Sequence, residues 1–145
     1  MDKKIAFLGG GNMAEALIKG LLAAGTARPD QIMVFDVSAD RLAHLKKAYS
    51  IEPAKTNNDA AREAGVIILS VKPQVVERVL GEIAGSVDTS KLVVSIAAGV
   101  SLAKIEKALA DGARVVRVMP NTPALVLAGA AALASGKNAT SDDLA

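Results

Sequence analysis

The sequence predicts an α/β fold of the Rossmann type, a doubly wound and mostly parallel sheet with helices on both faces. Short apolar runs alternate with stretches of helical periodicity along almost the whole chain, which favours parallel strands joined by right-handed crossovers. Hydrophobic residues make up 51% of the 145 residues and aromatic residues only 2%, so the core must be aliphatic, as in sheets covered on both faces. A glycine-rich turn follows the first apolar run.

The strands are expected where apolar residues are continuous, over residues 4–8, 31–36, 52–54, 66–71, 92–96 and 114–119. The segment at 52–54 contains Pro53 and is expected at a sheet edge, because proline cannot donate to a central ladder. Residues 126–134 predict one more strand, although their alanines also favour a helix.

The helices are expected between these strands, over residues 12–24, 38–49, 56–65, 75–83 and 101–109. Ser38 and Ser101 are placed to cap two of them, and an asparagine is placed to cap the helix that ends at Gly65. The final "ATSDDLA" places a serine cap and two acids where a further helix would begin.

Composition excludes several classes of function. The chain has no cysteine, which removes disulfides, thiolate metal sites and cysteine nucleophiles, and its single histidine, His44, excludes a histidine metal cluster. We expect His44 on the surface and outside any catalytic site. The net charge is only +2 and no basic block is present, so nucleic-acid binding is not expected. No run reaches the ~20 apolar residues of a membrane helix, and we expect a soluble, cytoplasmic protein.

The glycine-rich turn predicts a dinucleotide site. Gly9, Gly11 and Ala14 form G-x-G-x-x-A between a strand and a helix. The first glycine permits the tight turn, the second lets the backbone approach a pyrophosphate, and the small third residue lets helix and strand pack closely. The start of the helix then offers free N–H groups to the phosphates.

The residues after the second strand leave the choice between NAD and NADP open. Asp36 follows the glycine motif by roughly twenty residues, where an acid accepts hydrogen bonds from the adenosine ribose and repels a 2′-phosphate. This favours NAD. Ser38 and Arg41 follow, however, and both are suited to holding that phosphate.

Three more loops follow strand ends and are expected at the same edge of the sheet: "SVKPQ" (70–74), "IAAGVS" (96–101) and "MPNTP" (119–123). Small residues in the second loop would let a flat ring lie against the backbone. Asn121 and Thr122 could bond a carboxamide or a substrate carboxylate, and Lys72 is the cation of these loops. No serine–histidine–acid set can be built nearby, so hydrolysis by that route is not expected.

The segments "FLGGGNMAEAL", "SVKPQ", "VVSIAAGVSL" and "VRVMPNTPALV" together resemble pyrroline-5-carboxylate reductase, from Lys4 to about Gly136. The resemblance implies an oxidoreductase of proline biosynthesis that passes a hydride from a reduced nicotinamide to the C=N bond of 1-pyrroline-5-carboxylate, giving L-proline. A protonated imine is already electrophilic, so this reaction depends mainly on placing the hydride donor. The resemblance identifies no catalytic residue in this chain.

The resemblance also implies a set of binding residues. Those for NADP or NAD are Leu8, Gly9, Gly10, Gly11, Asn12, Met13, Asp36, Asn57, Ser70, Val71, Lys72, Pro73, Ile96, Ala97 and Ala98. Those beside the nicotinamide and the substrate are Met119, Pro120, Asn121, Thr122 and Pro123. No metal is implied.

Two departures from the family pattern bear on function. Members often carry serine, asparagine or threonine where this chain has Asp36, and many prefer NADPH. The family also has a helical C-terminal domain that forms the dimer and completes the substrate site. We therefore expect residues 1–136 to be the dinucleotide-binding domain and residues 137–145 to begin the linker or helix leading to that domain, with a homo-oligomer formed only through it. This chain alone is expected to bind cofactor with little or no turnover.

Two alternatives remain at this point. One is another NAD(P)-dependent reductase, of the 3-hydroxyacid or prephenate dehydrogenase type, although those enzymes usually carry a lysine or histidine suited to proton transfer. The other is a module that senses nucleotides without chemistry. Oxidation of the cofactor by a given substrate separates the three possibilities.

Overall fold

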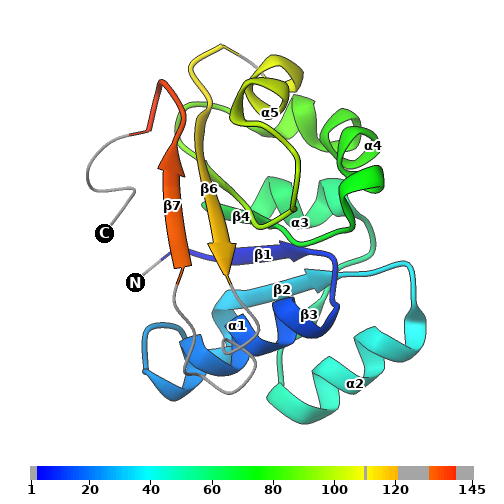
Figure 1. Ribbon diagram of the computed structural model, residues 1–145. Helices are drawn as coiled ribbons and strands as arrows, with labels where there is room; N and C mark the ends of the chain where they lie inside the picture. The colour runs from blue at the N-terminus through cyan, green and yellow to red at the C-terminus, as the bar shows by residue number, and fades with distance from the viewer. Residues whose placement is uncertain (1–2, 110, 121–130, 140–145) are drawn as a thin grey trace.

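The structure, a computed structural model, describes residues 3–109, 111–120 and 131–139. Strands and helices alternate along the chain (Figure 1). The strands are β1 (Ile5–Leu8), β2 (Ile32–Phe35), β3 (Glu52–Pro53), β4 (Val66–Leu69), β5 (Leu92–Ser95), β6 (Arg114–Pro120) and β7 (Ala131–Ser135). The helices are α1 (Asn12–Ala23), α2 (Ala39–Tyr49), α3 (Asn57–Glu63), α4 (Pro73–Ile83) and α5 (Leu102–Ala108), with short 3₁₀ turns at Pro29–Gln31 and Ala84–Ser86.

The strands form one sheet in the order β3-β2-β1-β4-β5-β6-β7. All pairs from β3 to β6 are parallel, and β7 alone runs antiparallel, against β6. This order reverses between β1 and β4, which is the switch point where open α/β sheets bind their ligands. The predicted doubly wound Rossmann fold is confirmed.

Alternation along the strands divides the core into two halves, one on each face of the sheet. On β1, Ile5 and Phe7 pack with α1 and α2, whereas Ala6 and Leu8 pack with α3, α4 and α5. Figure 1 shows the two groups of helices on opposite sides of the sheet. Central strands buried on both faces explain the continuous apolar runs in the sequence.

The observed elements differ from the expected ones mainly at their ends. The strand expected to reach Val71 ends at Leu69, and Pro73 begins α4, where its missing N–H costs no helical hydrogen bond. The asparagine cap of α3 was wrong: the Thr56 side chain accepts the N–H of Asp59, and Asn57 is the first helical residue. Of the segment expected at 126–134, residues 131–134 belong to β7, and the helix expected near the end of the chain lies outside the described residues.

This architecture places four loops side by side. The loops after β1, β2, β4 and β5 all leave the same edge of the sheet, because these strands are parallel neighbours. Hydrogen bonds hold the loops together there: Gly9 N donates to Phe35 O at 2.8 Å, and Ser70 N donates to Leu8 O at 2.9 Å. Within the described residues, no helix has the length and apolar character needed to span a bilayer.

Candidate functional site

Gly9 makes the turn at the end of β1, and the structure leaves room for no other residue there. Its φ of +108° lies in a region that side chains rarely adopt. A Cβ on Gly9 would also lie 2.6 Å from the carbonyl oxygen of Ser70. The Ser70 hydroxyl donates to Gly9 O at 2.7 Å, which draws the two loops together. The first glycine of the motif is therefore required by the protein itself.

Gly11 is different, because nothing in the protein requires a glycine there. Its φ is −77° and its ψ −168°, values open to any residue, and a Cβ would meet no atom within 4 Å. Gly11 is the N-cap of α1, and within the described residues no side chain caps this end of the helix. The first backbone N–H groups of α1 therefore face an open space beside Gly11.

Gly10 has both of its backbone polar groups engaged by other residues. Its N–H donates to Asp36 Oδ2 at 2.7 Å, and its carbonyl oxygen accepts a 2.7 Å bond from Arg41 Nε. The peptide bond to Gly11 is trans, so this carbonyl and the Gly11 N–H point in opposite directions. Because Arg41 binds the carbonyl, the Gly11 N–H is fixed pointing away from Arg41.

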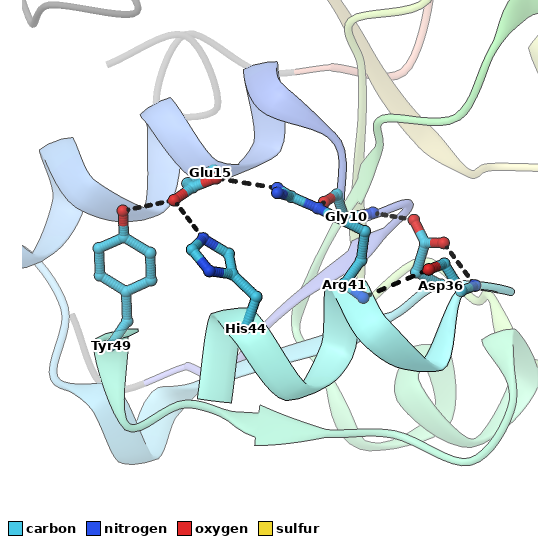
Figure 2. Close-up of polar contacts among 7 residues, drawn as sticks. Gly10, Glu15, Asp36, Arg41, His44 and Tyr49 are labelled. Carbon is cyan, nitrogen blue, oxygen red and sulfur yellow. Dashed lines mark hydrogen bonds and ion pairs between the residues drawn. The ribbon is translucent and has the colours of Figure 1, made fainter. Parts of the chain in front are cut away.

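A polar network supports this turn from α1 and α2, as Figure 2 shows. Glu15 on α1 lies 2.9 Å from the Arg41 guanidinium through Oε2, and 2.9 Å from both His44 Nε2 and the Tyr49 hydroxyl through Oε1. The hydrogen bond from His44, with those from Arg41 and Tyr49, outweighs burial and lowers the pKa of Glu15 from its usual 4.5 to about 2. Glu15 therefore stays ionised at every ordinary pH.

Asp36 holds the turn from the other side. Its Oδ2 accepts the Gly10 N–H, and its Oδ1 accepts the Ser38 N–H at 2.8 Å. The Ser38 hydroxyl caps α2 by accepting the Arg41 N–H at 3.3 Å, as its place in the sequence predicted. Each carboxylate oxygen accepts more than one hydrogen bond, so Asp36 retains capacity for a ligand.

A cleft of about 380 Å³ opens above these loops, a volume typical of small-molecule sites. Seven of the predicted residues line it: Gly9, Gly11, Asp36, Asn57, Ser70, Val71 and Lys72. Five others were not predicted: Phe35, Val37, Val75, Arg78 and Val79. A second hollow of about 630 Å³ shares Phe35, Val37, Asn57 and Arg78 with the cleft and so continues it.

Asn57 lines this cleft and has an acceptor that none of the described residues uses. The residue is only 6% exposed, and its Nδ2 donates to Glu82 Oε2 at 2.8 Å. In the part of the chain that the structure describes, its Oδ1 is buried without a hydrogen-bond partner. An unpaired buried carbonyl oxygen is costly, so this position fits a ligand that brings a donor.

The walls of the cleft face each other from the loop after β2 and from α4. Val37 is 83% exposed, which is unusual for a large apolar side chain, and it lines both hollows. Val75, Arg78 and Val79 lie on one helical face of α4 opposite it. Sequence reasoning missed this wall because helical spacing gave the apolar face of α4 but not the loop that this face opposes.

Of the remaining predicted residues, those that the structure describes do not line the cleft. Leu8 is buried in β1, and Pro73 is the first residue of α4. Asn12 and Met13 form the first turn of α1, and Ile96, Ala97 and Ala98 form the loop after β5 at the same edge of the sheet. Met119 and Pro120 end β6, whereas Asn121, Thr122 and Pro123 lie outside the described residues. His44, on α2, does not line the cleft.

Comparison with known proteins identifies the family of this chain. A family model described as NADP oxidoreductase coenzyme F420-dependent matches residues 4–99, more than half of the chain. The chain belongs to this family. The match to this family begins just before β1 and ends within the loop that follows β5.

Individual relatives of this chain confirm the resemblance to pyrroline-5-carboxylate reductase. The pyrroline-5-carboxylate reductase of Escherichia coli is 42% identical over all of this chain and 54% of its own length. A solved pyrroline-5-carboxylate reductase from Coxiella burnetii matches with a TM-score of 0.93 and 36% identity, over 99% of this chain and 53% of its own. The Plasmodium falciparum enzyme, solved with NADP bound, matches with a TM-score of 0.86 and 31% identity, over 99% of this chain and 52% of its own. The chain thus spans about half the length of the relatives it matches.

The two outer glycines of the motif should respond differently to the same substitution. Gly9→Ala should lower the free energy of unfolding by about 2 kcal/mol or more, because the new Cβ meets the Ser70 carbonyl in a strained backbone conformation. Gly11→Ala should cost less than about 1 kcal/mol, since its backbone is unstrained and its surroundings are open. Urea unfolding of both variants measures the difference, and equal losses would contradict the distinct roles given to the two glycines.

Proposed function

We propose that this chain binds a nicotinamide dinucleotide in the cleft, with the pyrophosphate against Gly9, Gly11 and the first turn of α1. The observation that carries this proposal is Gly11, a glycine at the cleft with an ordinary backbone conformation and no protein atom near its missing side chain. A ligand that must approach the backbone closely gives a reason for glycine there. The uncapped N-terminus of α1 supplies N–H donors and partial positive charge to that ligand.

The adenosine half fits the hollow beyond Asp36. The Asp36 carboxylate is suited to accept hydrogen bonds from the ribose hydroxyls, and the unpaired Asn57 Oδ1 is suited to accept one from an amine or hydroxyl of the nucleoside. Val37 and Arg78 border both hollows and offer an apolar contact and a guanidinium plane for the flat adenine ring. A buried acceptor without a partner and a highly exposed valine are both explained by one ligand.

The nicotinamide half would extend along the sheet edge toward the loops after β4 and β5. Ser70–Pro73 and Ile96–Ala98 follow neighbouring parallel strands, and Ile96 N donates to Leu69 O at 3.1 Å, which holds the second loop beside the first. The end of β6, Met119–Pro120, is next along this edge and continues into residues 121–123. We propose that this end of the cleft holds the nicotinamide and the substrate.

We propose further that NAD is preferred over NADP. Asp36 lines the cleft with an ionisable carboxylate, which would repel a 2′-phosphate. Arg41, which the sequence offers to such a phosphate, is held elsewhere, because its guanidinium donates to the Gly10 carbonyl and to Glu15. The family description and the Plasmodium falciparum relative name NADP, so the two nucleotides must be compared directly.

The whole protein is proposed to reduce 1-pyrroline-5-carboxylate to L-proline in proline biosynthesis. When bound, the reduced nicotinamide supplies the hydride, and the residues of this chain bind and orient it. The proposal rests on the reductases that this chain matches from end to end. We also propose that residues 137–145 begin the connection to a second domain, which would complete the substrate site and form the homo-oligomer.

Substitution of Gly11 should separate binding from folding. Gly11→Val should abolish binding of NADH, because a branched side chain would occupy the position of the pyrophosphate, while the unfolding midpoint changes little. Gly85→Val is the matched control, since Gly85 is also exposed with open space around it and does not line the cleft. Titration followed by NADH fluorescence measures both variants. Unchanged affinity in Gly11→Val would refute the binding mode.

The reaction can be tested in a chimera in which this chain replaces the matching half of the Escherichia coli relative. This chimera should oxidise NADH when 1-pyrroline-5-carboxylate is supplied, and should do so faster than NADPH at equal low concentrations, because of Asp36. Absorbance at the nicotinamide band gives the rates. A folded chimera that binds NADH but oxidises neither nucleotide with this substrate would overturn the proposed reaction.

A further inference from the structure

We propose that Glu15 determines which dinucleotide the site selects, by holding the Arg41 guanidinium on the outer side of the glycine turn and away from the 2′-phosphate of NADP. The inference rests on the proposed function, because it concerns the same cleft. It assigns to Glu15, a residue of α1 outside the lining of the cleft, a positioning role in nucleotide choice.

The position of Arg41 in the chain makes it the natural ligand for such a phosphate. It is the third residue of α2, and its backbone N–H is bound by the Ser38 hydroxyl, next to Asp36. A guanidinium this close to Asp36 would pair with a 2′-phosphate in a bidentate manner if no protein group held it elsewhere. The cation is thus at the correct end of the site.

The structure shows what holds the guanidinium on the outer side of the turn. Nε donates to the Gly10 carbonyl at 2.7 Å, and one terminal nitrogen donates to Glu15 Oε2 at 2.9 Å. Figure 2 shows the side chain extending from α2 toward α1, with its guanidinium directed at Glu15. The Arg41 and Glu15 side chains are only 30% and 23% exposed, so water and salt screen this ion pair less than a surface pair.

Glu15 is itself fixed by two further donors. The Tyr49 hydroxyl and His44 Nε2 both bind its other oxygen, Oε1, at 2.9 Å. Burial, followed by the adjacent Glu15 carboxylate, raises the pKa of Tyr49, so its hydroxyl remains a proton donor. The carboxylate therefore cannot rotate away from Arg41 without losing contacts on both oxygens. The positive charge of Arg41, beside the proposed ribose site, is in this way neutralised by Glu15, which does not line the cleft.

The inference predicts a selective effect of removing Glu15. Glu15→Ala should raise the affinity for NADPH relative to NADH by about tenfold, because Arg41 loses the carboxylate that holds it at α1 and regains an uncompensated charge. NADH lacks the 2′-phosphate, so its own affinity should change little. If Glu15 had a merely structural role, its loss would lower the affinity for both nucleotides by the same factor. The ratio of the two dissociation constants would then stay unchanged.

Fluorescence titration of the chain with NADH and NADPH, each at two salt concentrations, measures this ratio. Adding Arg41→Met to Glu15→Ala should abolish the gain, since the gain requires the guanidinium. Tyr49→Phe is the matched control: it removes a partner of Oε1 but leaves Arg41 held, so the ratio should remain that of the parent chain. Higher salt should reduce the rise in NADPH affinity of Glu15→Ala more than it reduces NADH affinity.

The outcomes separate this inference from the proposed function. A parent chain that binds neither nucleotide would overturn both. A parent chain that binds NADH, together with a ratio unchanged in Glu15→Ala, would overturn the role of Glu15 and leave the dinucleotide site standing. If circular dichroism shows that Glu15→Ala does not fold, Glu15→Gln keeps the shape and removes the charge; its ratio should shift the same way by about threefold, and an unchanged ratio overturns the inference.

Discussion

The close approach of Gly9 to the carbonyl of Ser70 is the constraint on which the site depends. It brings the loop after β1 against the loop after β4, at the point where the strand order of the sheet reverses. A side chain at Gly9 would separate these loops and move the start of α1. The cleft, the exposed backbone at Gly11 and the uncapped helix end all follow from this one contact. The fold therefore creates the binding surface before any ligand arrives.

The three consecutive glycines have different structural roles. Gly9 allows the turn, Gly10 anchors it through Asp36 and Arg41, and Gly11 leaves space for the ligand. Because trans peptide groups alternate in direction, anchoring the Gly10 carbonyl on the outer side leaves the Gly11 N–H pointing the other way. Glu15 then holds the arginine that performs this anchoring, so a single ion pair affects both the shape of the turn and the charge near the ribose.

The sequence predicted the fold well because apolar runs and glycine punctuation report local structure directly. The errors lie where a contact between distant residues determines the end of an element. Strand β4 ends before Ser70, whose hydroxyl binds the turn after β1. Thr56 caps α3, whereas the Asn57 amide binds Glu82 on α4. The glycine, Asp36, Asn57 and Ser70–Lys72 parts of the cleft were predicted, but its α4 wall was not. The sequence showed that Arg41 is suited to holding a 2′-phosphate, but no local pattern shows that Glu15, 26 residues away, engages it.

The claim that bare backbone at Gly11 binds the pyrophosphate can be tested directly by following assigned backbone amide resonances during a titration with NADH. We expect the Gly11 amide, with those of Asn12 and Met13, to shift strongly downfield as each N–H acquires an anionic acceptor. The Gly10 amide, already bound to Asp36, should move far less. A Gly11 resonance that stays in place while NADH binding saturates would contradict the account, because the nucleotide would then be bound elsewhere.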